Sequence, residues 1–149
     1  MPDFATNPRA RYDYDILETF EAGLVLRGYE VKSIKSGKVS IKGAYVKIVA
    51  GVPKLIGASI APYQPGNVPP DYREQADRTL LLSKSQIASL VGLAKSHGVT
   101  LVPLKLYAKG NIVKLEIGVA RGKKKYDKRE AIAKREAERS IQRAMRRRA

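Results

Sequence analysis

The stretch of sequence that decides the fold is LVPLKLYAKGNIVKLEIGVA, residues 101–120. Apolar side chains alternate with other residues on both sides of a Lys-Gly-Asn turn at residues 109–111. Alternation with a period of two is typical of a half-buried β-strand, and a short glycine-containing turn between two such runs indicates a hairpin. We therefore predict a β-hairpin with one apolar and one polar face, and we expect Lys105 and Lys114 on the polar face.

Shorter patterns precede this hairpin along the chain. Apolar runs predict strands at residues 22–27, 39–49 (broken by Gly43), 54–60 and 79–82. A helical turn is predicted at residues 31–37, and a longer helix begins after Ser83 and ends at His97 and Gly98. This order predicts a mainly β fold, a small antiparallel β-barrel with flanking helices. Periodicity leaves open whether the barrel is of the OB type.

Positive charge is concentrated at the C-terminal end of the chain. The protein has 149 residues and a formal net charge of +15. Its last 29 residues hold 13 Lys and Arg against 4 Asp and Glu, whereas residues 1–120 hold 16 against 10. We therefore predict one folded domain, residues 1–122, and a basic C-terminal tail, residues 123–149. Such a tail favours a polyanionic partner, and we expect it to be disordered when free and helical on nucleic acid.

Composition also excludes several classes of protein. The chain has no cysteine, which excludes disulfides, thiol chemistry and cysteine zinc sites. No run approaches 18 apolar residues, and the first fifteen residues are too polar for a signal peptide. We predict a cytoplasmic protein with no membrane contact.

An enzyme is the first alternative. Asp71, Glu74 and Asp77 would lie on one side of a helix and could bind Mg²⁺ for RNA cleavage. Arginines interleaved with them favour a solvated surface instead. The lone His97 lies beside Gly98 at a predicted helix end, where a cation is favourable, which favours a structural role. We predict no catalytic residue, no metal and no cofactor.

Nucleic-acid binding fits the composition better. Several tyrosines lie among basic residues, and tyrosine rings stack on exposed bases. Most tyrosines of a small domain serve packing. Tyr126 is the exception, because it lies inside the basic segment of residues 122–129. A general single-strand-binding OB protein and a ribosome-associated RNA chaperone both remain open on these grounds.

Five segments in order and spacing resemble a known family. They are ETFEAG (residues 18–23), GYEVKS (28–33), LLL (80–82), LVPLKLY (101–107) and GKKKYDKRE (122–130). The chain resembles the SmpB family of bacterial SsrA-binding proteins from about Asn7 to its C-terminus. This resemblance implies an OB-type barrel and non-catalytic RNA binding in the rescue of stalled ribosomes.

The resemblance also implies partners for each part of the chain. The barrel would bind the tRNA-like domain of tmRNA (SsrA RNA), which elongation factor Tu helps to deliver as alanyl-tmRNA. The tail would enter the empty mRNA channel and contact the rRNA of the small subunit.

Candidate site residues follow from the matching positions and from the basic pattern. For tmRNA they are Asn7, Glu21, Leu81, Lys105 and Lys114. For the decoding centre and the tail they are Gly122, Lys123, Lys124, Tyr126, Asp127, Lys128, Arg129, Arg135, Arg139 and Arg143. Glu21 would either accept hydrogen bonds from RNA or orient a neighbouring lysine. Two positions depart from the family pattern: Pro8 replaces the usual lysine after the asparagine, and Ser83 replaces a larger polar residue.

Overall fold

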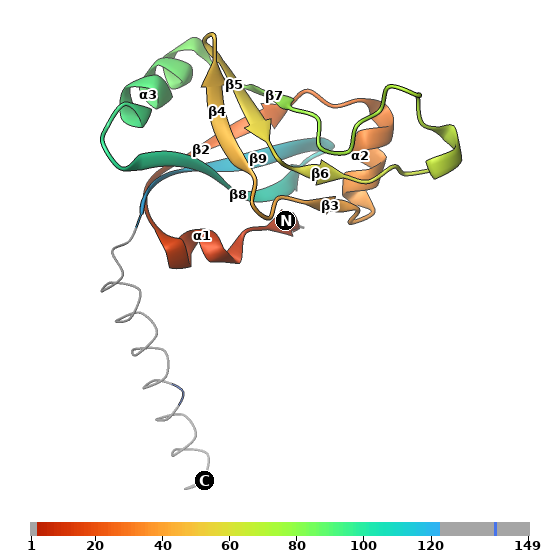
Figure 1. Ribbon diagram of the computed structural model, residues 1–149, viewed down its shortest axis with the longest axis horizontal. Coiled ribbons are helices and arrows are strands. Elements are labelled where there is room, and N and C mark those ends of the chain that lie inside the picture. The colour runs from red at the N-terminus through yellow and green to blue at the C-terminus, as the bar shows by residue number, and fades with distance from the viewer. Residues whose placement is uncertain (1–2, 123–138, 140–149) are drawn as a thin grey trace, which may run out of the picture.

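The computed structural model describes residues 3–122 and Arg139. The described residues form a mainly β fold, as predicted, with three α-helices around the strands (Figure 1). In chain order the elements are β1 (Asp3–Thr6), α1 (Pro8–Asp13), β2 (Tyr14–Leu24), α2 (Gly28–Lys35), β3 (Val39–Ser40), β4 (Tyr45–Val49), β5 (Val52–Ile56), β6 (Ser59–Ile60), the 3-10 helix η1 (Pro65–Asn67), β7 (Arg78–Leu81), α3 (Lys84–Ala94), β8 (Val99–Lys109) and β9 (Ile112–Gly122).

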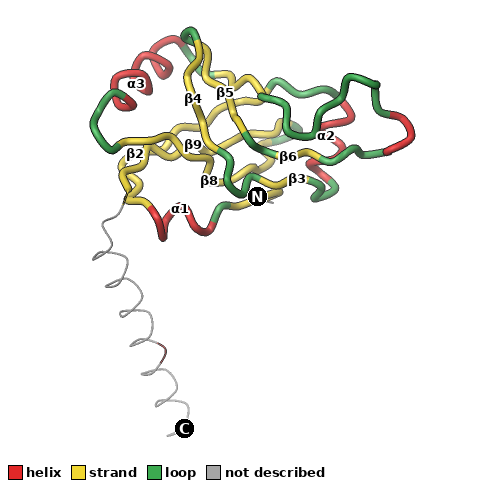
Figure 2. The backbone as a smooth tube through the Cα atoms, viewed as in Figure 1, coloured by secondary structure: helices red, strands yellow, loops and turns green. Residues whose placement is uncertain are grey.

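Antiparallel pairing joins most of these strands into one sheet. Its order is β1-β8-β4-β5-β7-β2-β9, and β9 also pairs with β8. The pairings therefore run from β8 through β4, β5, β7, β2 and β9 back to β8. The helices lie outside this ring of strands, with α1 below it, α2 at one end and α3 at the other (Figure 2). A second small sheet pairs β3 with β6.

The hairpin predicted from residues 101–120 is confirmed as β8 and β9. Pairing runs from Val99 opposite Arg121 to Lys109 opposite Ile112. Gly110 occupies the turn with a φ of +62°, a conformation that glycine adopts without strain. The register shifts between Pro103 and Lys105, so β8 has one extra residue there.

This bulge makes the prediction of one continuous apolar face wrong. Val102 and Leu104 pack with Ala10 of α1 and Ala120 of β9 in a small outer cluster. Leu106, two residues beyond Leu104, lies in the main core instead. The extra residue reverses the alternation, and α1 covers the outer face of the hairpin near its base. Residues 101–104 are consequently all buried.

Other strands differ from the predictions in their ends. The strand predicted at residues 22–27 ends at Leu24 and forms the last part of a much longer strand, β2. The predicted break at Gly43 is confirmed, with a φ of +76°. The run at residues 54–60 is divided into β5 and β6 at Gly57, which has a φ of +84°. Sequence patterns missed β1, α1 and the first half of β2, because their residues alternate weakly between apolar and polar.

Both departures from the family pattern lie at helix starts. Pro8 is the first residue of α1, where its missing N–H is not needed. Ser83 is the N-cap of α3, as predicted: its Oγ accepts a hydrogen bond from the Gln86 N–H at 3.2 Å, and the Ser83 N–H donates to Gln86 Oε1 at 3.1 Å. This reciprocal pair is a capping box.

Of the predicted tail, residues 123–149, the structure describes only Arg139, which is helical and exposed. The remaining tail candidates, from Lys123 to Arg143, lie outside the described residues. Gly122 ends β9 and pairs with Tyr14. Within the described residues, no helix combines the length and the apolar character needed to cross a membrane.

Candidate nucleic-acid interface

Strands β8, β9 and β2 share an outward face that collects three of the five predicted tmRNA-binding residues. In one row across these strands, Lys105 lies opposite Glu116, and Glu116 lies opposite Glu21. The next row on the same face, two residues along each strand, contains Lys114 of β9. We call this surface the β2–β9 face.

Leu81 extends this surface onto β7. Gly23 lies opposite Leu81 of β7 and opposite Lys114 of β9. A Cβ atom built on Gly23 would lie 3.4 Å from Leu81 Cβ and 3.8 Å from Lys114 Nζ. Because Gly23 has no side chain, no side chain separates Leu81 from Lys114 at this position. Leu81 is 57% exposed, although leucines of this fold are otherwise mostly covered.

Glu21 is held by two donors from β8. The Tyr107 hydroxyl donates a short hydrogen bond to Glu21 Oε2, and Lys109 Nζ lies 3.1 Å from Oε1. The Tyr107 hydrogen bond and then that of Lys109 lower the pKa of the Glu21 carboxyl. Burial and the hydrogen bond to Glu21 raise the pKa of the Tyr107 hydroxyl. Glu21 thus contacts a neighbouring lysine, Lys109, and either role expected for it toward RNA stays a prediction.

Lys105 also has partners within the β2–β9 face. Its Nζ lies 3.5 Å from Glu116 Oε2 and 5.3 Å from the centroid of the Tyr107 ring. Both contacts lie beside a pocket of about 500 Å³. The pocket is lined by Asp3, Thr19, Phe20, Glu21, Lys105, Tyr107 and Glu116. Sequence reasoning missed Tyr107 and Lys109 as site residues, although the alternation from Lys105 places both on its face.

Charges on the β2–β9 face are balanced. Lys105, Lys109 and Lys114 are the cations, and Asp3, Glu21 and Glu116 are the anions. Of the three lysines, Lys114 has no ion pair with any residue that the structure describes. A balanced face gives little bulk attraction for a polyanion, but its fixed donors and acceptors are suited to specific contacts.

Asn7, the fifth predicted tmRNA-binding residue, lies apart from the others. Its Nδ2 donates to the Pro103 carbonyl at 3.1 Å, and its backbone N–H donates to the Leu104 carbonyl at 2.9 Å. Asn7 therefore satisfies the backbone of the β8 bulge. It also lines a pocket of about 720 Å³ between α1 and the start of β4, together with Lys42 and Tyr45.

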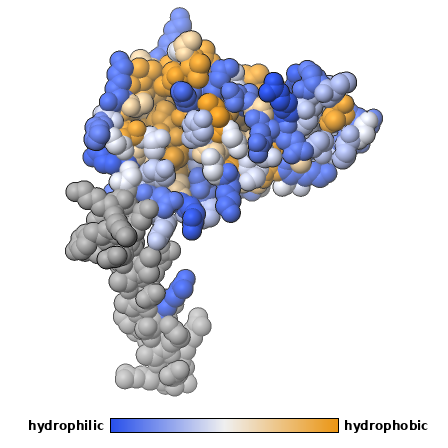
Figure 3. Space-filling view, viewed as in Figure 1, coloured by the Kyte–Doolittle hydropathy of each residue, from blue (hydrophilic) through white to orange (hydrophobic). Residues whose placement is uncertain are grey.

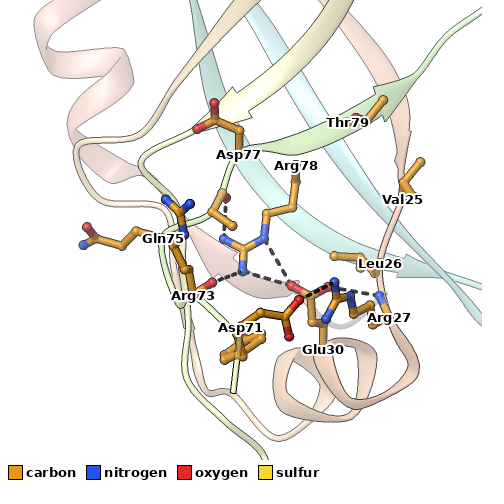
Figure 4. A pocket seen from close by; sticks show the side chains of 12 residues that line it. Val25, Leu26, Arg27, Glu30, Asp71, Arg73, Gln75, Asp77, Arg78 and Thr79 are labelled. Atoms are coloured by element: carbon orange, nitrogen blue, oxygen red, sulfur yellow. Dashed lines mark hydrogen bonds and ion pairs between the residues drawn. The ribbon is translucent and has the colours of Figure 1, made fainter. Parts of the chain in front are cut away.

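A third pocket, of about 540 Å³, surrounds a buried ion pair (Figure 4). Arg78 Nη2 lies 2.9 Å from Glu30 Oε2, and both side chains are nearly inaccessible to solvent. The remaining donors of Arg78 bind backbone carbonyls of residues 58, 73, 74 and 76. Glu30 Oε1 in turn accepts from the Arg27 N–H at 3.0 Å. Because Arg78 also binds backbone carbonyls of the loop before β7, this ion pair holds that loop in place.

This loop also corrects the expectation of an acidic helix face. Residues 71–77 form turns and coil, not a helix, so Asp71, Glu74 and Asp77 do not share a helix face. Asp71 is 3.8 Å from Arg27, and the Glu74 carbonyl accepts from Arg78. Among the described residues, no three carboxylate or histidine side chains are grouped so as to hold a metal ion.

An antiparallel sheet that exposes lysines and a leucine on one face is suited to binding nucleic acid. Comparison with known proteins agrees with this class. A family model described as "SmpB protein" matches residues 4–147. The chain belongs to the SmpB family.

Individual relatives match over nearly the whole chain. The SsrA-binding protein of Chloroflexus aggregans is 49% identical over 144 residues, which cover 97% of this chain and 91% of that protein. The SsrA-binding protein of Geobacillus thermodenitrificans is 50% identical over 146 residues, with 97% and 92% covered. A solved structure described as "tmRNA-SmpB: a journey to the center of the bacterial ribosome" contains a chain with 41% identity and a TM-score of 0.67, covering 85% of this chain and 92% of that chain.

Proposed function

We propose that this chain is a non-catalytic RNA-binding protein that binds the tRNA-like domain of tmRNA and delivers it to stalled ribosomes for trans-translation. The observation that carries the proposal is the grouping of Glu21, Leu81, Lys105 and Lys114 on one outward surface. These residues come from three separate segments of sequence. The names of the curated relatives and the tmRNA–SmpB structure support the same RNA partner.

The ring of strand pairings supports an OB-type barrel, which would form the RNA-binding domain of residues 1–122. On its β2–β9 face, Lys114 and Lys109 would bind phosphate oxygens, since ammonium groups are point cations with rotatable donors. Leu81, which is exposed, would contact sugar or base. Glu21 would fix the direction of Lys109.

The basic tail, residues 123–149, would occupy the empty mRNA channel and contact the rRNA of the small subunit. Its charge of 13 Lys and Arg against 4 Asp and Glu supports a polyanionic environment. Elongation factor Tu would act indirectly, through alanyl-tmRNA. The chain would work in the cytoplasm, where ribosomes and tmRNA meet.

A competition assay tests the RNA partner. Labelled tRNA-like domain is bound to the full chain and challenged with unlabelled tRNA-like domain, ordinary tRNA or an unstructured single strand. We expect displacement at the lowest concentration by the tRNA-like domain. Equal displacement by all three would instead support a general single-strand-binding protein or an RNA chaperone.

Matched lysine variants test the β2–β9 face itself. Lys114→Gln removes the lysine of this face that has no ion pair among the described residues, and we expect affinity for the tRNA-like domain to fall about tenfold. Lys95→Gln removes an exposed cation just after α3, on another part of the molecule, and should leave affinity nearly unchanged. Equal effects of the two variants would show that only total charge matters.

A further inference from the structure

Charge in the folded domain is concentrated away from the β2–β9 face. Residues 31–70 contain no Asp or Glu, and their lysines are Lys32, Lys35, Lys38, Lys42, Lys47 and Lys54. This acid-free segment forms most of α2 and the strands from β3 to β6. Because the β2–β9 face is balanced in charge, the domain's attraction for a polyanion comes mainly from this other region.

A small pocket lies at the α2 end of the molecule. It is enclosed by the first turn of α2 and the loop that contains η1, and its volume is about 240 Å³. Its main side chains are Tyr29, Lys32, Tyr63, Gln64 and Asn67. In the space-filling view this end is largely hydrophilic (Figure 3). The volume is below the ~300–1,000 Å³ of pockets for drug-sized ligands, so it suits a group the size of one planar ring system.

Both tyrosines of the pocket are held in place. The Tyr29 hydroxyl accepts a hydrogen bond from Arg27 Nη1 at 2.6 Å, and its ring packs edge-on against Tyr72 at 5.3 Å. Lys38 Nζ donates to the Tyr63 carbonyl at 3.3 Å and lies 5.8 Å from the centroid of the Tyr63 ring. Aromatic rings that are already oriented lose little freedom when a ligand stacks on them.

Two side-chain amides supply a polar edge to the pocket. Asn67 Nδ2 donates to Gln64 Oε1 at 2.9 Å. This bond leaves the Gln64 amide nitrogen as a donor and Asn67 Oδ1 as an acceptor, and neither has a further partner among the residues described. A donor beside an acceptor complements the edge of a nucleobase, which presents the same two groups side by side.

We propose that this pocket binds one unpaired nucleobase of an RNA. The base stacks on the tyrosine rings and places its polar edge on Gln64 and Asn67. Lys32 and Lys38 bind the adjoining phosphates. The identity of that RNA as tmRNA rests on the proposed function above, whereas the recognition of a base does not.

A titration of the full chain with two small probes tests base recognition directly. Adenosine monophosphate carries a base and a phosphate, and ribose 5-phosphate carries the phosphate alone. By NMR, we expect the Tyr29 and Tyr63 ring signals and the Gln64 and Asn67 side-chain amide signals to shift with adenosine monophosphate. Ribose 5-phosphate should leave them unchanged. Equal shifts with both probes, or none with either, would overturn the proposal.

A second measurement links the pocket to RNA affinity. Stacking of one base is worth about 1–3 kcal/mol, so Tyr63→Ala should weaken binding of the tRNA-like domain about 5- to 150-fold. Tyr45→Ala removes another exposed tyrosine, on β4 outside this pocket, and is the matched control. If Tyr63→Ala and Tyr45→Ala bind as tightly as the unaltered chain, the base pocket is wrong. If the unaltered chain itself fails to bind the tRNA-like domain, the proposed function is wrong, and the probe titration still decides the pocket.

Discussion

The hydroxyl of Tyr107 and the carboxylate of Glu21 form the contact on which the β2–β9 face depends most. Removing the hydroxyl by Tyr107→Phe deletes the main cause of the lowered pKa of Glu21, so that pKa should rise toward its ordinary value of 4.5. Lys109 then loses an oriented partner, and we expect affinity for the tRNA-like domain to fall about three- to tenfold. A pH titration of the Glu21 carboxyl carbon by NMR, with RNA binding measured at pH 7, checks both effects.

The sign of the pH dependence follows from the direction of this shift. A carboxyl with a lowered pKa in the folded protein stabilises the fold above its unfolded pKa, and this contribution is lost as pH falls through the lowered pKa. The contribution of the Tyr107–Glu21 hydrogen bond to the free energy of unfolding, measured as the difference between the unaltered protein and Tyr107→Phe, should therefore vanish in acid. Tyr45→Phe is the control, because no residue of the described chain is hydrogen-bonded to the Tyr45 hydroxyl. An unchanged Glu21 titration in Tyr107→Phe would contradict the assignment.

Arg78 is the residue on which stability depends most clearly. Removing one partner of a buried ion pair leaves the other charge uncompensated. For Arg78→Met we expect the free energy of unfolding to fall by about 3–5 kcal/mol, because the buried Glu30 loses its partner and several carbonyls lose their donor. Urea denaturation measures the change. Arg73→Met, at an exposed position of the same loop, should alter stability by less than about 0.5 kcal/mol.

At the scale of elements, the β8–β9 hairpin has some features that its sequence predicts and others that it does not. Alternation and the glycine turn predicted both strands, because pattern and turn chemistry act locally. The bulge after Pro103 was hidden, since it depends on α1 packing over the outer side of the hairpin. Helix α1 itself is too short and too polar to be recognised from periodicity.

The candidate site follows the same division. Lys105 and Lys114 were found from alternation within one hairpin. Leu81 and Lys114 both pair with Gly23, on three strands from separate parts of the sequence, and no local pattern encodes their register. Glu21 and Leu81 were therefore identified through the family resemblance. Asn7 was identified in the same way, yet its side chain is bonded to the β8 bulge.

Two glycines on different elements should respond in opposite ways to alanine. A Cβ on Gly118 of β9 would lie 3.0–3.1 Å from side-chain atoms of Leu104, so Gly118→Ala forces the buried Leu104 side chain to shift. We expect a loss of about 1–3 kcal/mol in the free energy of unfolding. Gly92 of α3 has no atom within 4 Å of such a Cβ, so Gly92→Ala should stabilise by about 0.5–1 kcal/mol. Thermal denaturation of both variants checks the signs, and destabilisation by Gly92→Ala would show an unrecognised constraint on α3.

Across the whole molecule, charge is divided among three regions with different roles. The β2–β9 face is balanced, the acid-free segment of residues 31–70 is basic, and the tail of residues 123–149 is more basic still. Under the proposed function, long-range attraction to RNA would therefore come from regions other than the β2–β9 face. An encounter guided by the basic regions would precede docking of the balanced face.

This division predicts separable losses of function. Deleting residues 127–149 leaves every described strand and helix of the domain in the chain. Affinity for the tRNA-like domain should change by less than about tenfold at physiological salt, since the contacts on the β2–β9 face remain and only long-range attraction is reduced. Peptide tagging on stalled ribosomes should be abolished, because nothing then occupies the empty mRNA channel.

The matched variant is Lys114→Gln in the full chain, which should weaken tmRNA binding while retaining the tail. Gel-shift affinity and tagging in a reconstituted translation system measure the two properties on the same preparations. Loss of tmRNA binding on removal of the tail, or tagging that survives without it, would show that the two parts of the chain do not divide the work in this way.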